Sequence, residues 1–115
     1  MPERTVVCNT SPLLYLYQVG QLGLLQSLYG QVVTPQAVQD AGSFQPGSLL
    51  ILDDGLGRKI ARLSHLSYTG ALGVLVKSKQ AGFIPRVSPV IEALRQTTMH
   101  LSPELISLVL KEAGE

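Results

Sequence analysis

Short apolar runs alternate with amphipathic segments along this chain of 115 residues. Runs of β-branched and aliphatic residues predict strands at 4–8, 31–33, 49–52 and 66–69. Apolar residues at helical spacing predict helices at 13–20, 21–29, 35–42, 56–64, 70–80, 89–97 and 103–112. Strands that alternate with helices predict an α/β fold, in which helices flank a short, mostly parallel sheet of about four strands.

Prolines and glycines mark the predicted helix ends. Four of the seven prolines follow Ser or Thr at a helix start, namely Pro12, Pro35, Pro89 and Pro103. Ser or Thr is a good N-cap and proline a good first helical residue, so Ser11 is expected to cap the first helix. Glycines at 20, 30, 42 and 82 are expected to end helices.

The strand at 49–52 is expected to lie at the centre of the sheet, because four consecutive large aliphatics favour burial on both faces. Asp53 and Asp54 follow it directly. Ligands of open α/β sheets bind where strands end, so this acidic pair is a candidate site. Alternatively, Asp54 only caps the next helix. If the strand ending at Cys8 is a neighbour, Asn9 converges on the same edge.

Bulk composition predicts a single domain over residues 1–115. The chain is 45% hydrophobic and 15% charged, which favours an apolar face buried in a homo-oligomer or against a partner. A net charge of +1 gives no overall attraction to nucleic acid, and no apolar run is long enough for a membrane span. The single cysteine, Cys8, excludes an intrachain disulfide and fits a reducing cytoplasm.

Four segments in order resemble PIN-domain proteins, in the uncharacterised branch near the VapC ribonuclease toxins. These segments are Val7–Leu14, Leu22–Val38, Leu50–Ala61 and Thr69–Leu75, the last continuing through Lys77, Gly82 and Ile84-Pro85. The resemblance implies a three-layer nuclease fold, with an acidic cluster that holds Mg²⁺ or Mn²⁺ for attack of water on an RNA phosphodiester. It also implies a toxin–antitoxin setting with an antitoxin-like partner.

The chain departs from that family pattern at two places. The first acidic residue of the pattern falls on Asn9, a neutral and poorer oxygen ligand. The segment that would carry an essential glutamate is missing, because residues 40–47 run almost directly into the strand at Leu49. The chain is therefore expected to be a truncated PIN-like domain, whose acidic cluster is reduced to Asp53, Asp54 and an amide.

The candidate site residues carry different expected roles. Asp53 and Asn9 are the candidate catalytic residues, and Asp53, Asp54 and Asn9 the candidate metal ligands. Candidate nucleic-acid contacts are Thr10, Ser11, Arg58, Arg62 and Thr69, with capping or a solvated helix face as the alternative for each. His65 and His100 lack partners at metal spacing and are expected to be structural or at the surface. Gly70 and Gly73 allow the helix that starts there to approach a neighbouring backbone closely.

Three functions are compatible with these residues. The first is a degenerate, oligomeric PIN-like protein that binds itself, a partner protein or RNA, with little nuclease activity. The second is a Mg²⁺-dependent endoribonuclease whose site is completed across a subunit interface, for example by Glu92 or Glu104. The third is a small nucleotide-binding module of flavodoxin-like shape, against which the absence of a phosphate-binding glycine loop argues.

Overall fold

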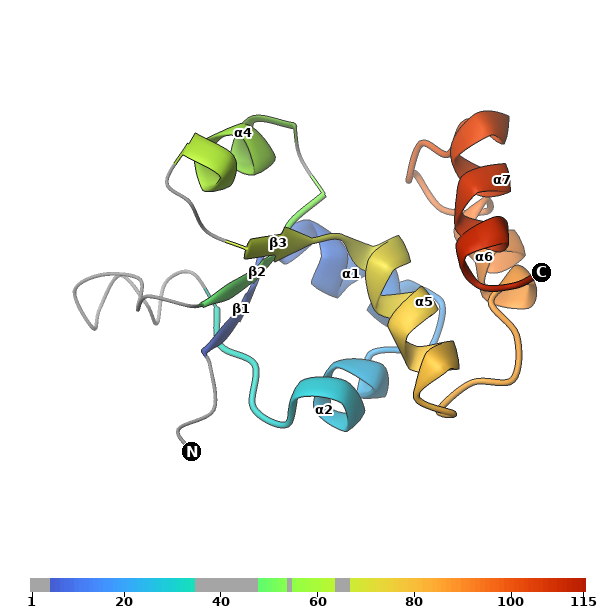
Figure 1. The fold of residues 1–115 in the computed structure, drawn as a ribbon, viewed down its shortest axis with the longest axis horizontal. Coiled ribbons are helices and arrows are strands. Elements are labelled where there is room, and N and C mark those ends of the chain that lie inside the picture. Colours follow the sequence, from blue (N-terminus) through green and yellow to red (C-terminus); the bar gives the residue numbers. More distant parts are fainter. Residues whose placement is uncertain (1–4, 35–47, 54, 64–66) are drawn as a thin grey trace.

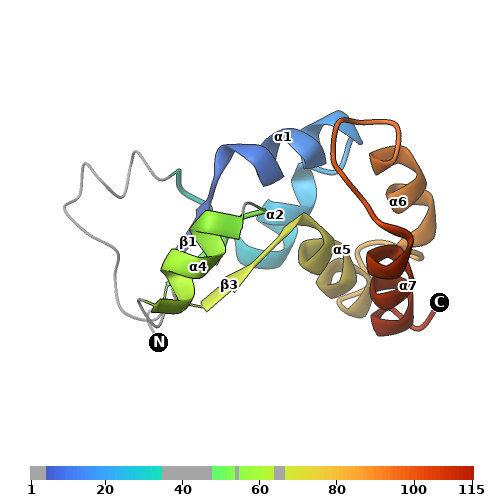
Figure 2. The same cartoon turned by 90° about the horizontal axis from the view of Figure 1, so that it is seen from above.

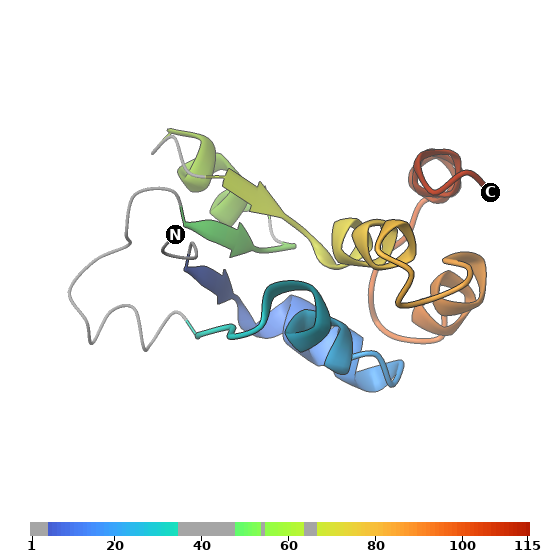
Figure 3. The same cartoon turned by 60° about the horizontal axis from the view of Figure 1, so that its bottom comes forward.

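Three parallel strands form the sheet of this protein. The computed structural model describes residues 5–34, 48–53, 55–63 and 67–115. The strands β1 (Val6–Cys8), β2 (Leu49–Ile51) and β3 (Ser67–Thr69) lie in the order β1-β2-β3, and all point the same way (Figure 3). β2 is the central strand, as its apolar run predicts.

The predicted strand at 31–33 contributes one residue to the sheet. Val33 forms a single parallel bridge to Val7 of β1. The Cys8 N–H donates to the Val33 carbonyl and the Val33 N–H donates to the Val6 carbonyl, each at 2.9 Å. Gly30 ends the preceding helix at a positive φ of 74°, and among residues 31–34, which follow it, Val33 alone forms a bridge to the sheet.

Six helices are described around these strands. Their bounds are α1 (Thr10–Gln18), α2 (Gly23–Tyr29), α4 (Gly55–Leu63), α5 (Ala71–Gln80), α6 (Ser88–Leu94) and α7 (Pro103–Glu112) (Figure 1). The helix and loop expected over 35–47 lie outside the described residues. None of the described helices has both the length and the hydrophobicity that crossing a membrane requires.

Helices cover both faces of the sheet, which gives the three layers expected from the sequence. Alternate residues of a strand point to opposite faces. Val7 and Leu50 therefore face α4, where Ala61 packs against them. The other face carries Val6, Cys8, Leu49 and Ile51, which form the main core with α1, α2 and α5 (Figures 1 and 2).

α5 is the central helix of the main core. Its residues Ala71, Val74 and Leu75 are completely buried. It contacts α1 and α2 on one side and α7 on the other, while β3 leads directly into its first turn (Figure 3). The start of α5 is thereby fixed at the end of β3, next to the end of β2.

The helix starts differ in part from the Ser-Pro and Thr-Pro expectation. Ser102 caps α7 and accepts from the Leu105 N–H at 3.2 Å, as predicted. For α1 the prediction of Ser11 was wrong, because Asn9 is the extended cap residue and its Oδ1 accepts from the Thr10 N–H. Val87 precedes α6, so Ser88 is already helical. At α1 the helix begins earlier than predicted, because Asn9, directly after β1, already provides the cap.

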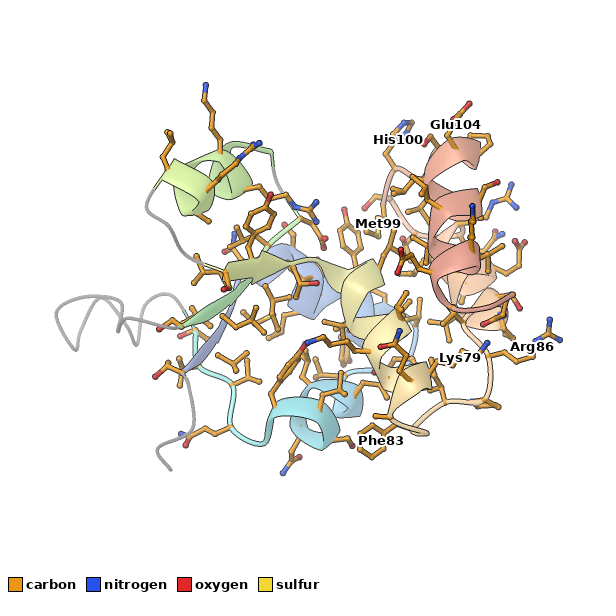
Figure 4. The ribbon with its side chains drawn as sticks, in the orientation of Figure 1. Lys79, Phe83, Arg86, Met99, His100 and Glu104 are labelled. Atoms are coloured by element: carbon orange, nitrogen blue, oxygen red, sulfur yellow. The ribbon has the colours of Figure 1, made fainter. Side chains whose placement is uncertain are left out.

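The last residue of the chain ties α5, α6 and α7 together. The Glu115 carboxylate accepts from the backbone N–H groups of Val87 and Ser88, at 2.6 and 3.1 Å, and from Lys79 Nζ at 3.1 Å. Lys79 Nζ also donates to the Ala113 carbonyl at 2.6 Å. Figure 4 shows Lys79 and Arg86 at this end of the molecule, where Arg86 Nε lies 3.7 Å from Glu115 Oε1. These contacts stabilise the packing of α7.

Candidate carboxylate edge of the sheet

The carboxyl ends of the three strands meet at one edge, which we call the carboxylate edge. Asn9 follows β1, Leu52 and Asp53 follow β2, and Gly70 follows β3. The Asn9 N–H donates to the Ile51 carbonyl at 2.9 Å, and the Leu52 N–H donates to the Thr69 carbonyl at 2.8 Å. These bonds hold the strand ends together, and they place Asn9 and Asp53 at the same edge, as expected from the sequence.

Asp53 caps the start of α5 from a neighbouring strand. Its Oδ1 accepts from the Ala71 N–H at 3.1 Å. The N-cap residue of α5 is Gly70, which has no side chain with which to accept that bond. A carboxylate near a helix N-terminus is also stabilised by the helix dipole. Asp53 thus satisfies a helix end that its own cap residue leaves open, and its side chain is only 13% exposed.

Arg58 of α4 turns back towards the same carboxylate. Its Nε donates to the Leu52 carbonyl at 3.1 Å, and its Nη2 lies 3.6 Å from Asp53 Oδ1. The guanidinium carbon lies 5.8 Å from the centre of the Tyr68 ring, within the range of a cation–π contact. A carbonyl, a carboxylate and an aromatic ring therefore fix the position of this side chain, which remains 40% exposed.

Gly70 leaves the space that this arrangement requires. A Cβ at position 70 would collide with Arg58 Nη2 and Asp53 Oδ1, and would lie 3.3 Å from the Leu52 carbonyl oxygen. The Gly70 backbone is extended, so its conformation alone does not demand glycine. The sequence predicted a close approach to backbone at this helix start. The structure shows that two charged side chains make the approach as well.

The candidate site residues after β1 lie at the carboxylate edge, but the structure indicates different roles for them. Asn9 Oδ1 accepts from the Thr10 N–H at 2.9 Å, which is the local, turn-satisfying role considered as the alternative. Thr10 and Ser11 form the first turn of α1 and are exposed. They are accessible to a ligand that reaches this edge.

Thr69 lines an open groove rather than the edge itself. The groove lies between α5 and α7 and has a volume of about 350 Å³. Leu72, Val76 and Leu108 provide apolar surface, and Lys77 and Glu112 contribute opposite charges. Thr69 Oγ1 also occupies the space that a Cβ at Gly73 would need. The second glycine of the pair therefore accommodates a side chain, and Thr69 is packed rather than projecting.

The remaining candidates are dispersed. Arg62 and Lys59 are exposed on α4. Glu92 pairs with Arg95 at 3.0 Å on the surface of α6. His100 and Glu104 are exposed at the start of α7, away from the strands (Figure 4). Asp54 and His65 lie outside the described residues, so their predicted roles stay predictions.

Cys8 is a core residue, as predicted, and lies within the electrostatic reach of Asp53. Its side chain is 1% exposed. Burial raises the pKa of the Cys8 thiol, and the negative charge of Asp53 raises it further, to about 11, while the Leu13 N–H acts in the opposite direction. The thiol is therefore protonated at neutral pH, which disfavours a role as a nucleophile or a thiolate ligand.

The donor groups that the structure describes at this edge do not fit a resident Mg²⁺ or Mn²⁺. Hard cations take carboxylate and other oxygen ligands. Within residues 5–34, 48–53, 55–63 and 67–115, no three His, Cys, Asp or Glu side chains come close enough to hold a metal ion together. Asp53 Oδ1 is already engaged by a backbone N–H and faces an arginine. The described part of the edge is a carboxylate–guanidinium pair rather than an acidic cluster.

One residue of this edge, Tyr68, was not singled out from the sequence, and the role of Gly70 was expected only in part. Tyr68 supports Arg58, and Gly70 serves the Asp53–Arg58 pair rather than only the backbone. The signal for Tyr68 was strand alternation. In β3 it pairs with Leu50, so it points to the face covered by α4, which also carries Arg58.

Comparison with known proteins agrees with this architecture. A family model described as PIN domain matches residues 5–40 and 41–115, which together are nearly the whole chain. The two matched parts meet between residues 40 and 41. No curated protein and no solved structure matches the chain.

Proposed function

The chain belongs to the PIN-domain family, and we propose that it acts as a binding member of that family with little nuclease activity of its own. The observation that carries this proposal is the composition of the carboxylate edge. Where the family pattern has an acidic cluster, the described residues provide Asp53 paired with Arg58, and the amide of Asn9. A nuclease that relies on metal-activated water needs a bound cation, and this pair supplies a weak site for one.

RNA is the first proposed ligand. The helix α4 carries Arg58, Lys59 and Arg62 and no acidic residue, although the net charge of the whole chain is only +1. A local cluster of basic residues attracts phosphates even when the overall charge is near zero. Thr10 and Ser11 add exposed hydroxyl groups after β1, at the carboxylate edge.

Self-association is the second proposed interaction. Large apolar side chains that are about half exposed or more are found on three helices, α1, α4 and α7, and after α5. They are Leu14, Tyr17, Leu63, Leu108 and Phe83. Such residues favour burial against a second copy or an antitoxin-like partner protein. A homodimer in light scattering at micromolar concentration supports this part of the proposal, and a monodisperse monomer contradicts it. A buried, protonated Cys8 suits the reducing cytoplasm that we propose for such an assembly.

The alternative function is a Mg²⁺-dependent endoribonuclease completed across a subunit interface. Glu104 supports it to the extent that the residue is exposed in the first turn of α7 and available to another subunit. Glu92 is less suited because Arg95 already pairs with it. The Glu104→Gln variant should then lose cleavage while it keeps its fold.

One assay separates the two functions. A labelled single-stranded RNA is incubated with the full chain in MgCl₂ or MnCl₂, and the products are resolved on a gel. We expect the unmodified chain to cleave the RNA no more than the Asp53→Asn variant does. That variant keeps an acceptor oxygen for the Ala71 N–H. Metal-dependent cleavage that disappears in Asp53→Asn contradicts the binding function and supports the nuclease.

A further inference from the structure

We propose that the Arg58 guanidinium is the resident cation of the carboxylate edge, so that this edge receives an RNA phosphate through Arg58 and without a divalent metal. The inference rests on the proposed binding function and adds the group that makes the contact. It starts from the disagreement between the family pattern, which expects a metal, and the donors that the structure describes.

The first support is the fixed position of Arg58. Its side chain contacts the Leu52 carbonyl, the Asp53 carboxylate and the Tyr68 ring. An arginine loses much conformational freedom when it binds a ligand, unless the protein already holds it in place. Here these contacts restrict the side chain before any ligand arrives, which favours binding over a merely solvated side chain.

The second support is the hydrogen-bonding capacity that remains. A guanidinium has five N–H donors in a planar fork and binds phosphate through two of them at once. The contacts to the Leu52 carbonyl and the Asp53 carboxylate use Nε and Nη2, and Nη1 takes part in neither of them. The side chain is 40% exposed, so a phosphate can approach it from solvent. Lys59 and Arg62 on the same helix add positive charge around that approach.

The third support is steric. The Asp53–Arg58 pair occupies the space beside Gly70 that a Cβ would otherwise fill. A metal at Asp53 Oδ1 would share that oxygen with the Ala71 N–H, 3.1 Å away, and would lie against the Arg58 guanidinium, whose Nη2 atom is 3.6 Å away. Two positive charges this close repel each other. The arrangement therefore favours the arginine over an added cation.

The test measures RNA binding by fluorescence anisotropy with a fluorescein-labelled oligouridine, in EDTA and in MgCl₂. We expect the affinity of the unmodified chain to agree within about twofold between the two buffers. Arg58→Gln should bind about tenfold more weakly, the loss typical of one charge-assisted contact. The matched control is Arg62→Gln, which removes the same charge one turn later from an exposed position and should cost about twofold. Arg58→Lys, which keeps the charge but not the fork, should also lose most of the tenfold.

A second measurement does not depend on RNA. Mn²⁺ is titrated into the unmodified chain and into Asp53→Asn, and the bound ion is followed by electron paramagnetic resonance. We expect the two affinities to agree within about twofold. One Mn²⁺ per chain that Asp53→Asn abolishes overturns the inference, as does RNA binding that requires Mg²⁺ or equal losses in Arg58→Gln and Arg62→Gln. The proposed function fails separately, through Asp53-dependent cleavage of the same RNA on a gel.

Discussion

The Asp53 carboxylate fills the space in which a side chain at Gly70 would stand, and it performs the capping that such a side chain would normally provide. The two residues follow adjacent parallel strands, β2 and β3. Ser, Thr, Asp or Asn at position 70 could in principle cap α5, but its Cβ would collide with the carboxylate. The absence of a side chain at one position therefore depends on the presence of an acid at the other.

Replacing Gly70 with alanine tests this dependence. We expect Gly70→Ala to lower the free energy of unfolding by about 1–3 kcal/mol, the cost typical of inserting a methyl group into a filled space. The control is Gly23→Ala at the start of α2, where a Cβ meets nothing within 4 Å. That variant should be neutral or more stable by up to about 1 kcal/mol. Urea unfolding followed by circular dichroism gives both values, and equal effects would contradict the steric argument.

Replacing Asp53 separates its capping role from its charge. Asp53→Ala removes the acceptor for the Ala71 N–H and should cost about 1 kcal/mol of unfolding free energy, a typical cap loss. Asp53→Asn keeps an acceptor oxygen and should cost about half as much or less. Chemical denaturation of the two variants under one buffer condition is the measurement. Equal losses would show that charge rather than capping dominates.

Cys8 should make the protein sensitive to alkali. The pKa of its thiol is about 11 in the folded chain against an ordinary value of 9.0. A group whose pKa is raised by folding contributes its full stability at pH values below its pKa in the unfolded chain. This stability is lost as the pH rises towards the pKa in the folded chain. The unfolding midpoint should therefore fall between pH 9 and pH 11. Cys8→Ala should show a smaller fall over this window, and an unchanged pH profile would count against the shift.

Glu115 should make the protein sensitive to acid. Backbone hydrogen bonding from Val87, followed by contacts to Lys79 and Ser88, lowers the pKa of its carboxyl from 4.5 to about 2. A carboxyl whose pKa is lowered by folding contributes its full stability at pH values above its pKa in the unfolded chain. That stability is lost as the pH falls through the pKa in the folded chain. The loss is expected between pH 4.5 and pH 2. Thermal unfolding of Glu115→Gln across this range should show less pH dependence than Glu104→Gln, which keeps the Glu115 carboxylate.

The positions of the strands could be predicted from the sequence because they depend on local runs of apolar residues. Four large aliphatics at 49–52 predict burial on both faces, and β2 is the central strand with every residue buried. Gly20, Gly30 and Gly82 end helices at positive φ, as expected. The run at 31–33 was less reliable, since whether a short apolar segment pairs along its length depends on the chain around it. Here it pairs at Val33 alone among the described strand contacts.

The contacts between residues of the site could not be predicted from the sequence in the same way. The spacing of Asp53 and Arg58 places them at a strand end and on the next helix, but it does not show that the arginine turns back to the Leu52 carbonyl. The sequence instead suggested Arg58 and Arg62 alike as candidate nucleic-acid contacts. The structure separates them, because Tyr68 lies beneath Arg58 while Arg62 is exposed. Contacts between distant residues decide which of two similar side chains is held.

The stretch of chain from β2 through α4 to the residue after β3 contains Asp53, Arg58, Tyr68 and Gly70, and this has a consequence for the order of folding. The β2–β3 pairing closes a shorter loop than the β1–β2 pairing, so its cost in chain entropy is lower. The site should therefore form early, before β1 joins the sheet. Pulse-labelling hydrogen exchange should detect protection of the Leu52 N–H, bonded to Thr69, before that of the Cys8 N–H, bonded to Val33.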